Sequence, residues 1–348
     1  MQAAPLVAFS RGAFDESVHF GSIAVADARG RLVASAGDPF RVTTMRSTAK
    51  PFQAMAVVEL GAADRFAFAP EELAVIAASH SGEPRHTETV AALLARSGLG
   101  EDALQTGIHS PLHAETRAAL ERAGRSPGPL HHNCSGKHCG MLCACIHRGW
   151  DVRTYVRPDH PLQKVVLGLV RDVTGLTSEE VGVAIDGCGV PTFAIPLAAI
   201  AASYARLATG DGLSEEHQRS AARVREAMLA HPEMVAGEGR LDTDLMVVAG
   251  GKVLAKAGAE ACYAVGLPET GWGMAVKIED GGARAVSVAV VEALRQIKAI
   301  GAEEAGALAR HARPPVRNYR DEIVGEARPV FQLTPSNTPP LRGRGSTY

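Results

Sequence analysis

The sequence has almost no excess charge of either sign: 36 Lys and Arg stand against 38 Asp and Glu, a formal net charge of -2 at pH 7. Nucleic acids and anionic lipid surfaces attract proteins with a marked positive excess, so neither partner is indicated. The sequence also has no apolar run as long as the roughly 18 residues that a membrane-spanning helix requires. We therefore expect neither a nucleic acid nor a membrane as a partner.

A secretory signal and a disulfide scaffold are also missing. The first twenty residues lack the basic, apolar and small segments of a signal peptide, so we expect a cytoplasmic protein. Six cysteines in 348 residues are too few for a disulfide scaffold, and four of them crowd between positions 134 and 145. The cysteines therefore predict either reduced thiols or a metal site.

What the sequence does contain is an ordinary core composition and a change of pattern along the chain. Hydrophobic residues make up 46% and charged residues 21%, which is usual for an enzyme of this size. Two β-type runs flank a polar turn at 27–30, and short β-type runs return from residue 252. Helical patterns, such as the one over 195–208, fill most of the middle.

These patterns predict an α/β (α+β) fold with one mainly antiparallel sheet built from both termini, at about 5–40 and 252–330. The helical middle region is predicted over about 47–250. We expect a single domain over residues 1–332. Residues 333–348 are rich in Pro, Ser and Gly, which predicts a disordered tail.

Residues 45–54, MRSTAKPFQA, place a Ser-x-x-Lys pattern at the start of an apolar helix. Proline is tolerated only in the first turn of a helix, so Pro51 puts Ser47 and Lys50 at or just before the helix start. A hydroxyl there lies at the positive end of the helix dipole, and an amine three residues on falls on the same face. A desolvated, neutral lysine can take the proton of a serine nucleophile, so the pattern predicts a Ser–Lys dyad for acyl transfer. The pattern alone also fits an N-capping serine beside a solvated lysine.

Three further loops combine polar side chains with glycine. SHSGEP at 79–84 lies between two predicted helices. HHNCSGKHCG at 131–140 precedes an apolar helix that we predict over 141–147. DGCGVPT at 186–192 is a predicted tight loop after a short strand. Glycine in each loop lets the backbone come close to a ligand or a neighbouring group, as functional loops require.

Three motifs in this order resemble those of serine β-lactamases and penicillin-binding proteins: Ser-x-x-Lys at 47–50, a serine loop at 79–81 and Lys-x-Gly at 256–258. Two departures are specific. Ser-His-Ser replaces the Ser-Asp-Asn of those enzymes, and Ala257 replaces the threonine of Lys-Thr-Gly. The missing signal peptide also argues against a cell-wall enzyme.

A closer resemblance covers the chain from its first predicted hairpin to Val330. It rests on five ordered motifs: RSTAKP at 46–51, SHSGE at 79–83, NCSGKH at 133–138, DGCGVP at 186–191 and KAGAE at 256–260. Together they resemble the rhizobial-type (class 3) L-asparaginases, and an ordered set is far more specific than any one motif. The resemblance implies a serine β-lactamase-like fold and hydrolysis of the side-chain amide of L-asparagine to L-aspartate and ammonia.

The same resemblance implies a nucleophile, a second Ser–Lys pair, a zinc site and a homodimer. It implies that Ser47 is the nucleophile, with Lys50 beside it, and that Ser79 and Lys256 form the second pair. The implied zinc ligands are Cys134, Lys137 and Cys188. Two thiolates are good zinc ligands, whereas a lysine is an unusual third ligand and needs a depressed pKa. His132 and His138 are more conventional ligand types close by in sequence.

Substrate recognition has three weaker candidates. Arg46 and His80 neighbour the two serines and can hold the α-carboxylate of a substrate. Asp186 can orient Lys137 or bind an α-ammonium group. Each of these residues also fits a purely structural role, such as capping a turn.

The sequence leaves four questions open. Spacing does not decide whether Ser47 or Ser79 attacks. Glutamine differs from asparagine by one methylene, so a glutaminase is a near alternative, as is a penicillin-recognising enzyme of the same fold. A different class is a non-catalytic zinc or thiol-redox protein that uses Cys134, Cys139 and Cys188. The zinc, if present, can be catalytic or structural.

Overall fold

The structure, a computed structural model, describes residues 2–336, and the chain divides into two compact units. Among the described residues, unit 1 consists of 2–48, 194–212 and 244–336. Unit 2 consists of Ala49–Phe193 and Leu213–Thr243. Each unit is therefore assembled from segments that are far apart in the sequence.

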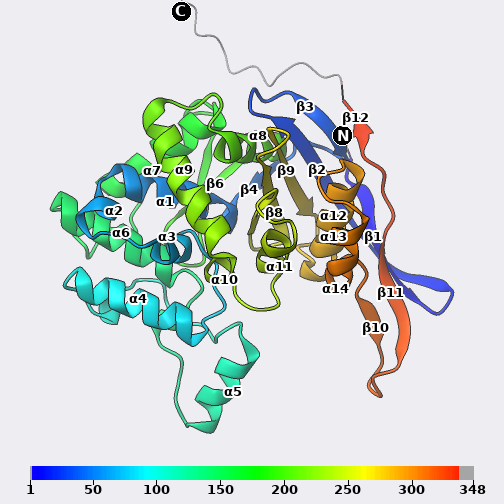
Figure 1. The fold of residues 1–348 in the computed structure, drawn as a ribbon, viewed down its shortest axis with the longest axis horizontal. Helices are drawn as coiled ribbons and strands as arrows, with labels where there is room; N and C mark the ends of the chain where they lie inside the picture. The colour runs from blue at the N-terminus through cyan, green and yellow to red at the C-terminus, as the bar shows by residue number, and fades with distance from the viewer. Residues whose placement is uncertain (1, 337–348) are drawn as a thin grey trace, which may run out of the picture. The chain divides into compact units, whose positions relative to one another are not determined.

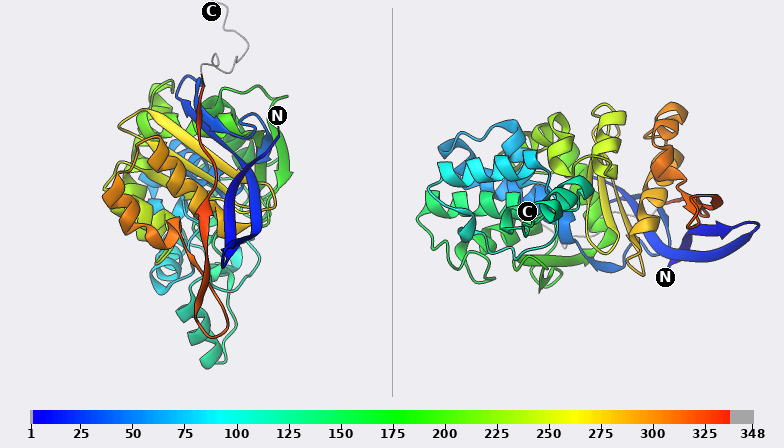
Figure 2. Two further views of the ribbon diagram at one scale, coloured as in Figure 1. Left: turned by 90° about the vertical axis from the view of Figure 1, so that its right-hand side faces the viewer. Right: turned by 90° about the horizontal axis from the view of Figure 1, so that it is seen from below.

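Unit 1 contains an antiparallel sheet with the strand path β10-β11-β1-β2-β9-β8-β7, and β3 pairs with both β2 and β12 (Figure 1). Its strands are β1 (Ala4–Arg11), β2 (Phe14–Asp27), β3 (Leu32–Ala36), β7 (Leu254–Ala257), β8 (Cys262–Leu267), β9 (Trp272–Ile278), β10 (Pro315–Arg317), β11 (Ile323–Pro329) and β12 (Thr334–Pro335). Figure 2 shows the long hairpin of β1 and β2, in blue, from two further sides. Strands from the beginning and the end of the chain thus share one sheet.

Helices α8 (Leu197–Thr209) and α12 (Ala283–Gln296) pack on this sheet. Helices α13 (Ala302–Ala307) and α14 (Ala309–Ala312) pack on α12. Helix α8 packs on β2, β8 and β9, and glycine makes the approach close: a Cβ at Gly273 would lie 2.0 Å from the carbonyl oxygen of Ala201. Consecutive residues along β8 are all buried, so both faces of the sheet are covered.

Unit 2 is almost entirely helical. Its elements are α1 (Lys50–Glu59), α2 (Ala62–Arg65), α3 (Pro70–Ile76), α4 (Pro84–Arg96), η2 (Glu101–Ala103), α5 (Ala114–Arg122), η3 (Pro129–His131), α6 (Ser135–Arg148), α7 (Pro161–Thr174), β5 (Gly182–Ile185), α9 (Glu215–Ala230) and α10 (Pro232–Val235). Helix α6 packs against α3 through two glycines: a Cβ at Gly136 would lie 2.1 Å from Val75 O, and one at Gly140 would lie 2.7 Å from Ile76 Cγ2. This close packing fixes the first turn of α6.

The remaining elements are short. They are η1 (Arg46–Ala49), β4 (Val42–Thr44), β6 (Pro191–Pro196) and α11 (Leu241–Val248). A three-stranded sheet has the order β4-β6-β5. Element η1 is a single 3-10 turn that runs directly into α1, so Ser47 and Lys50 fall on one continuous helical segment.

The predicted fold class is confirmed: the sheet is antiparallel, both termini supply it, and helices dominate the middle. Both helices predicted over 141–147 and 195–208 are present, but each begins at a different residue from the one predicted. The helix predicted over 141–147 begins at Ser135, because the glycines that suggested a loop serve the packing against α3. The helix predicted over 195–208 begins at Leu197, after strand β6, whose two prolines had hidden the strand pattern.

The prediction of a single domain over 1–332 stays a prediction. Of the predicted tail, 333–348, the first four residues belong to the described part and include β12, which pairs with β3. Residues 337–348 lie outside the described residues. Over the part of the chain that the structure describes, no helix combines the length and the apolar character needed to cross a membrane.

Candidate active site

Lys50 is the first residue of α1, and its side chain is buried within unit 2. Its Nζ atom lies 2.6 Å from Ala78 O, 2.9 Å from Ser79 Oγ and 3.1 Å from Asn133 O. The two carbonyl oxygens can only accept hydrogen bonds, so each takes one N–H of the amine. The serine hydroxyl is the one partner of Lys50 in this set that can either donate or accept.

This set of partners suits both protonation states of Lys50. As an ammonium, Lys50 donates its third N–H to Ser79 Oγ; as a neutral amine, it turns its lone pair to the same hydroxyl. Burial lowers the pKa of Lys50, and the thiols of Cys134 and Cys188 oppose that shift in part. A proton can therefore pass between Lys50 and Ser79 without any rearrangement of the two carbonyl contacts.

Ser79 lies just after α3, in the loop that leads to α4, and is buried. Its backbone N–H donates to Val235 O at 2.9 Å. The neighbouring His80 is fully buried, with Nδ1 accepting from the Gly82 N–H at 3.2 Å. His80 Nε2 lies 2.8 Å from the hydroxyl of Ser135, which itself donates elsewhere, so Nε2 carries the hydrogen.

Both ring nitrogens of His80 are thus engaged with protein atoms. Burial, followed by the charges of His86 and Lys50, holds the pKa of His80 well below its ordinary value, so the ring is neutral. Direct binding of a substrate carboxylate by this ring would require these hydrogen bonds to break. In the structure His80 fixes the path of the loop that carries Ser79.

Ser47 belongs to unit 1, where it lies on η1 and is buried. Its predecessor Arg46 has a φ of 49°, the left-handed conformation that is uncommon for a residue with a side chain. Its successor Thr48 is fixed from both sides, because Thr48 Oγ1 donates to Met45 O at 2.7 Å and Tyr204 donates to Thr48 O at 2.8 Å. The backbone that carries Ser47 is therefore held firmly.

Lys256 lies on β7 of unit 1 and is fully buried; its Nζ donates to Ala257 O at 2.8 Å. The strand that carries it approaches the Ser47 segment closely. A Cβ at Gly258 would lie 3.1 Å from Met45 O and 3.2 Å from Thr48 Cγ2. The structure thus brings the predicted Lys-x-Gly motif against Met45 and Thr48 in the segment that carries Ser47, within one unit.

The three predicted zinc ligands form a cluster in unit 2. Lys137 Nζ donates to Cys188 Sγ at 3.0 Å, and Cys188 Sγ lies 3.9 Å from Asp186 Oδ2. A hydrogen bond with Cys188 holds the pKa of Cys134 well below its ordinary value; burial opposes this shift, and Lys50 and Lys137 reinforce it. The lowered pKa favours the thiolate of Cys134, which is the form that binds metal.

The donor set fits zinc in type, with two sulfur ligands and an amine. Burial opposes protonation of Lys137, but the neighbouring sulfurs of Cys188 and Cys134 outweigh it and raise the pKa of this lysine. Metal binding by Lys137 would therefore release a proton. Within residues 2–336, no group of three or more His, Cys, Asp or Glu side chains is arranged to hold a metal, so the site depends on the lysine.

The two histidines near this cluster differ. His138 is buried, its Nδ1 lies 2.7 Å from the Tyr155 hydroxyl, and its Nε2 has no hydrogen-bond partner among the described residues. Burial lowers the pKa of His138 to about 4. His132 accepts from the Cys134 N–H at 3.0 Å through Nδ1, and burial, with the charge of His109, lowers its pKa to about 4 as well. Both imidazoles are neutral at pH 7.

The remaining predicted substrate residue, Asp186, lies in the turn after β5 and accepts from the Gly187 N–H at 2.8 Å. Sequence reasoning missed the carbonyl oxygens of Ala78 and Asn133, which hold Lys50, and the Tyr155 hydroxyl. Backbone carbonyls carry no sequence signal, and a lone tyrosine gives none either. The sequence paired Lys50 with Ser47, whereas the structure shows Lys50 hydrogen-bonded to Ser79, 29 residues away.

A buried lysine that shares a hydrogen bond with a serine hydroxyl is the arrangement of serine hydrolases in which an amine does the work of the usual histidine base. The Lys50–Ser79 contact is thus compatible with acyl-transfer chemistry. The sequence model of the L-asparaginase II family matches residues 7–329, and the chain belongs to that family. It is accordingly an L-asparaginase, an enzyme that hydrolyses the side-chain amide of L-asparagine.

No curated protein matches the sequence. Among solved structures, a β-lactamase from Mycobacterium bovis is 15% identical, covers 80% of this chain and 95% of its own, and gives a TM-score of 0.42. Mglu in its glutamate form is 18% identical and covers 80% of this chain, with a TM-score of 0.36. Mglu in its tris and glutamate form is 20% identical, with the same TM-score of 0.36. The chain spans 61% and 59% of the length of these two Mglu chains.

Proposed function

We propose that this L-asparaginase works by acyl transfer, with Ser47 as the nucleophile and Lys50 as the base. Ser47 Oγ attacks the side-chain carbonyl carbon of L-asparagine while its proton passes to the neutral Lys50 amine. The observation that supports Lys50 as the base is its buried amine, whose pKa is lowered. Beside two carbonyl oxygens, the amine has one partner that can exchange a proton with it, the Ser79 hydroxyl.

Ser79 returns the proton in this scheme. Collapse of the tetrahedral intermediate breaks the bond between carbon and nitrogen, and the leaving nitrogen must gain a proton to depart as ammonia. The hydrogen bond of 2.9 Å between Lys50 and Ser79 is the path by which that proton reaches the Ser79 hydroxyl and then the nitrogen. Water then hydrolyses the β-aspartyl ester on Ser47 and releases L-aspartate.

Lys256 supplies a second positive charge in this proposal. It is buried on β7, and the chain just after it, at Gly258, lies against Met45 and Thr48 in the segment that carries Ser47. A buried cation favours the ionised form of a neighbouring hydroxyl, which is the role we assign to it. Arg46 and Asp186 remain our candidates for the α-carboxylate and the α-ammonium group of the substrate.

We also propose that Cys134, Lys137 and Cys188 hold a zinc ion. The lowered pKa of Cys134 and the contact of 3.0 Å between Lys137 and Cys188 support this assignment. When bound, zinc is a Lewis acid that can polarise an oxygen ligand at its fourth position. The chain's own residues supply the two sulfurs and the amine.

Two further proposals concern the assembly and the compartment. The family resemblance supports a homodimer, which light scattering of the purified protein at several concentrations would test. All six cysteines are free, in agreement with a reducing compartment such as the cytoplasm. Expression with a compartment-specific label would test that location.

The test of the proposed function is ammonia release from L-asparagine by the wild type and by Ser47→Ala. We expect the variant to lose activity by orders of magnitude while its far-UV circular dichroism is unchanged. Acid quenching during turnover, followed by peptide mass spectrometry, should place a β-aspartyl adduct on Ser47; an adduct on Ser79 would reverse the two roles. Parallel assays with L-glutamine and nitrocefin decide between the alternative substrates.

A further inference from the structure

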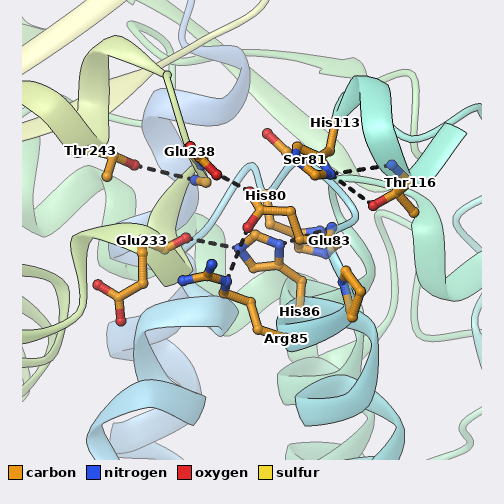
Figure 3. Close-up of polar contacts among 12 residues, drawn as sticks. His80, Ser81, Glu83, Arg85, His86, His113, Thr116, Glu233, Glu238 and Thr243 are labelled. Carbon is orange, nitrogen blue, oxygen red and sulfur yellow. Dashed lines mark hydrogen bonds and ion pairs between the residues drawn. The ribbon is translucent and has the colours of Figure 1, made fainter. Parts of the chain in front are cut away.

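Two loops of unit 2 are joined by hydrogen bonds at regular intervals. One loop begins at Ser79 and runs into the first turn of α4; the other, residues 231–243, contains α10 and the glycine-rich turn after it (Figure 3). We call four of the hydrogen bonds between them the loop clamp. They are Ser79 N to Val235 O at 2.9 Å, Ser81 Oγ to Ala236 O at 2.7 Å, Glu238 N to Glu83 Oε1 at 2.9 Å, and His86 Nε2 to Glu233 O at 2.8 Å.

Glu83 is the unusual member of the loop clamp, because it is a buried carboxylate. A buried charge is costly unless it is hydrogen-bonded and paired. Glu83 satisfies both conditions: Oε1 accepts from the Glu238 N–H, and Oε2 lies 3.0 Å from Nε of the exposed Arg85 (Figure 3). Removal of this carboxylate would leave the Glu238 N–H without its acceptor.

The opposite loop is shaped to fit Glu83. Gly237 has a φ of +113°, and a Cβ there would lie 2.2 Å from Glu83 Oε1 and 3.0 Å from Ser81 Oγ. Only glycine tolerates both the conformation and the space. The Gly237 N–H in turn donates to Thr243 Oγ1 at 3.2 Å, so the turn is tied at its base as well.

The loop clamp includes the backbone N–H of Ser79, the residue whose hydroxyl faces Lys50. Movement of residues 235–238 would therefore move Ser79 relative to the Lys50 amine, which Ala78 O and Asn133 O hold in place. We infer that Glu83 is a positioning residue, which fixes Ser79 against Lys50 through the loop clamp. This inference rests on the proposed function, in which the Lys50–Ser79 contact carries the proton.

The kinetic test compares Glu83→Ala with Glu83→Gln. A glutamine keeps an oxygen that can accept from the Glu238 N–H, so we expect Glu83→Gln to retain a near wild-type kcat. Glu83→Ala lacks the acceptor, and a displacement of Ser79 by about 1 Å is expected to lower kcat by about 100-fold, with little change in KM. Ser81→Ala removes only a hydroxyl, and with it the loop-clamp bond to Ala236 O. This variant should also lower kcat, as Glu83→Ala does.

Glu72 provides a matched control. It is also a buried glutamate in unit 2; it accepts from the Ala69 N–H at 2.9 Å and pairs with Arg96 at 2.5 Å, but it belongs to the start of α3. Glu72→Ala should lower the thermal midpoint about as much as Glu83→Ala, yet leave kcat unchanged. Equal losses of kcat in the Glu72 and Glu83 variants would mean that Glu83 acts only through stability, which overturns the inference.

Amide hydrogen exchange separates this inference from the proposed function. In Glu83→Ala the amides of Glu238 and Ser79 should exchange faster than in the wild type, whereas in Glu83→Gln they should stay protected. Exchange that is unaltered in Glu83→Ala would refute the loop clamp, whatever the activity. An active Ser47→Ala enzyme would instead refute the proposed nucleophile and leave the exchange result standing.

Discussion

Lys50 Nζ lies 2.9 Å from Ser79 Oγ, while two backbone carbonyl oxygens hold the same amine from other directions. The two carbonyl oxygens thus fix the Lys50 amine but cannot take its proton, whereas the Ser79 hydroxyl can exchange a proton with the amine. The Ser79 hydroxyl is what distinguishes Lys50 from a lysine held only by carbonyl oxygens, because a carbonyl oxygen can accept a hydrogen bond but cannot exchange a proton with the amine.

Lys50→Arg should inactivate the enzyme even though it keeps the positive charge. A guanidinium stays protonated at any pH at which the protein is folded, so it cannot accept the proton of a serine. Loss of general-base catalysis should reduce kcat by about 10²–10⁴-fold. Ammonia release from saturating L-asparagine measures the effect.

Lys277→Met is the matched control for that experiment. Lys277 is also a buried lysine bound to carbonyl oxygens, those of Glu260 and Ile278, but it lies on β9 of unit 1. We expect this variant to keep a kcat near that of the wild type. A Lys50→Arg enzyme with full activity would exclude Lys50 as the base.

The pH dependence of kcat/KM should report the same group. Because burial lowers the pKa of Lys50, a larger fraction of the amine is neutral at a given pH than for a solvent-exposed lysine. Activity should therefore rise with pH as Lys50 loses its proton and reach a plateau below the ordinary lysine pKa of 10.5. A stopped assay in overlapping buffers measures the profile; a rise only above pH 10.5 would contradict the assignment.

The sequence was sufficient to predict Lys50 at a helix start, because Pro51 and the apolar spacing after it are local signals. It could not predict Ser79 as the partner, since that contact depends on how α1 and α3 pack in unit 2 and on two carbonyl oxygens without a side-chain signature. The same limit explains the start of α6. Gly136 looks like a loop residue in the sequence and becomes a packing residue only when α3 lies against it.

Gly136→Ala should destabilise the protein. Its Cβ would lie 2.1 Å from Val75 O, a backbone atom that cannot move alone, and overpacking of this kind costs about 1–3 kcal/mol. The opposite result is expected for Gly168→Ala on α7, where a Cβ would meet nothing within 4 Å. Alanine favours a helix over glycine by about 0.5–1 kcal/mol, so that variant should gain stability.

Urea unfolding of these two glycine variants gives the measurement, with the wild type as reference. Both substitutions add one methyl group to a helix of unit 2, so any difference between them comes from the space around the new Cβ. Equal midpoints for Gly136→Ala and Gly168→Ala would show that α6 does not approach α3 as closely as described.

His217 should make stability depend on pH. Its Nδ1 lies 2.9 Å from Glu59 Oε1 and its Nε2 lies 3.4 Å from Asp172 Oδ2. Burial opposes protonation, but the hydrogen bonds and charges of Glu59 and Asp172 outweigh it and raise the pKa of His217 above 6.5. A group whose pKa is higher in the folded protein stabilises it below the unfolded pKa, and that contribution disappears as the pH rises through the folded value.

His217→Asn should therefore be less stable than the wild type at pH 5.5 by an amount on the order of 1 kcal/mol or less, because solvent screens a partly exposed pair. The gap should narrow as the pH rises toward 9, because the wild-type imidazole loses its proton as the pH passes its raised pKa. Thermal midpoints at the two pH values measure it. A gap that is equal at pH 5.5 and pH 9 would mean that packing, not charge, connects His217 to its neighbours.

Zinc content should depend on Cys134 and Cys188 and not on the other thiols. Cys134 has a pKa well below the ordinary value, whereas burial raises the pKa of Cys262 to about 11, so the latter is a neutral thiol at pH 7. Cys134→Ser and Cys188→Ser should lose stoichiometric zinc after gel filtration, and Cys262→Ser should keep it. Metal analysis by mass spectrometry gives this result independently of activity. A stoichiometric zinc content in Cys188→Ser would show that Cys188 is not a zinc ligand, because a serine hydroxyl is a poor substitute for a thiolate ligand.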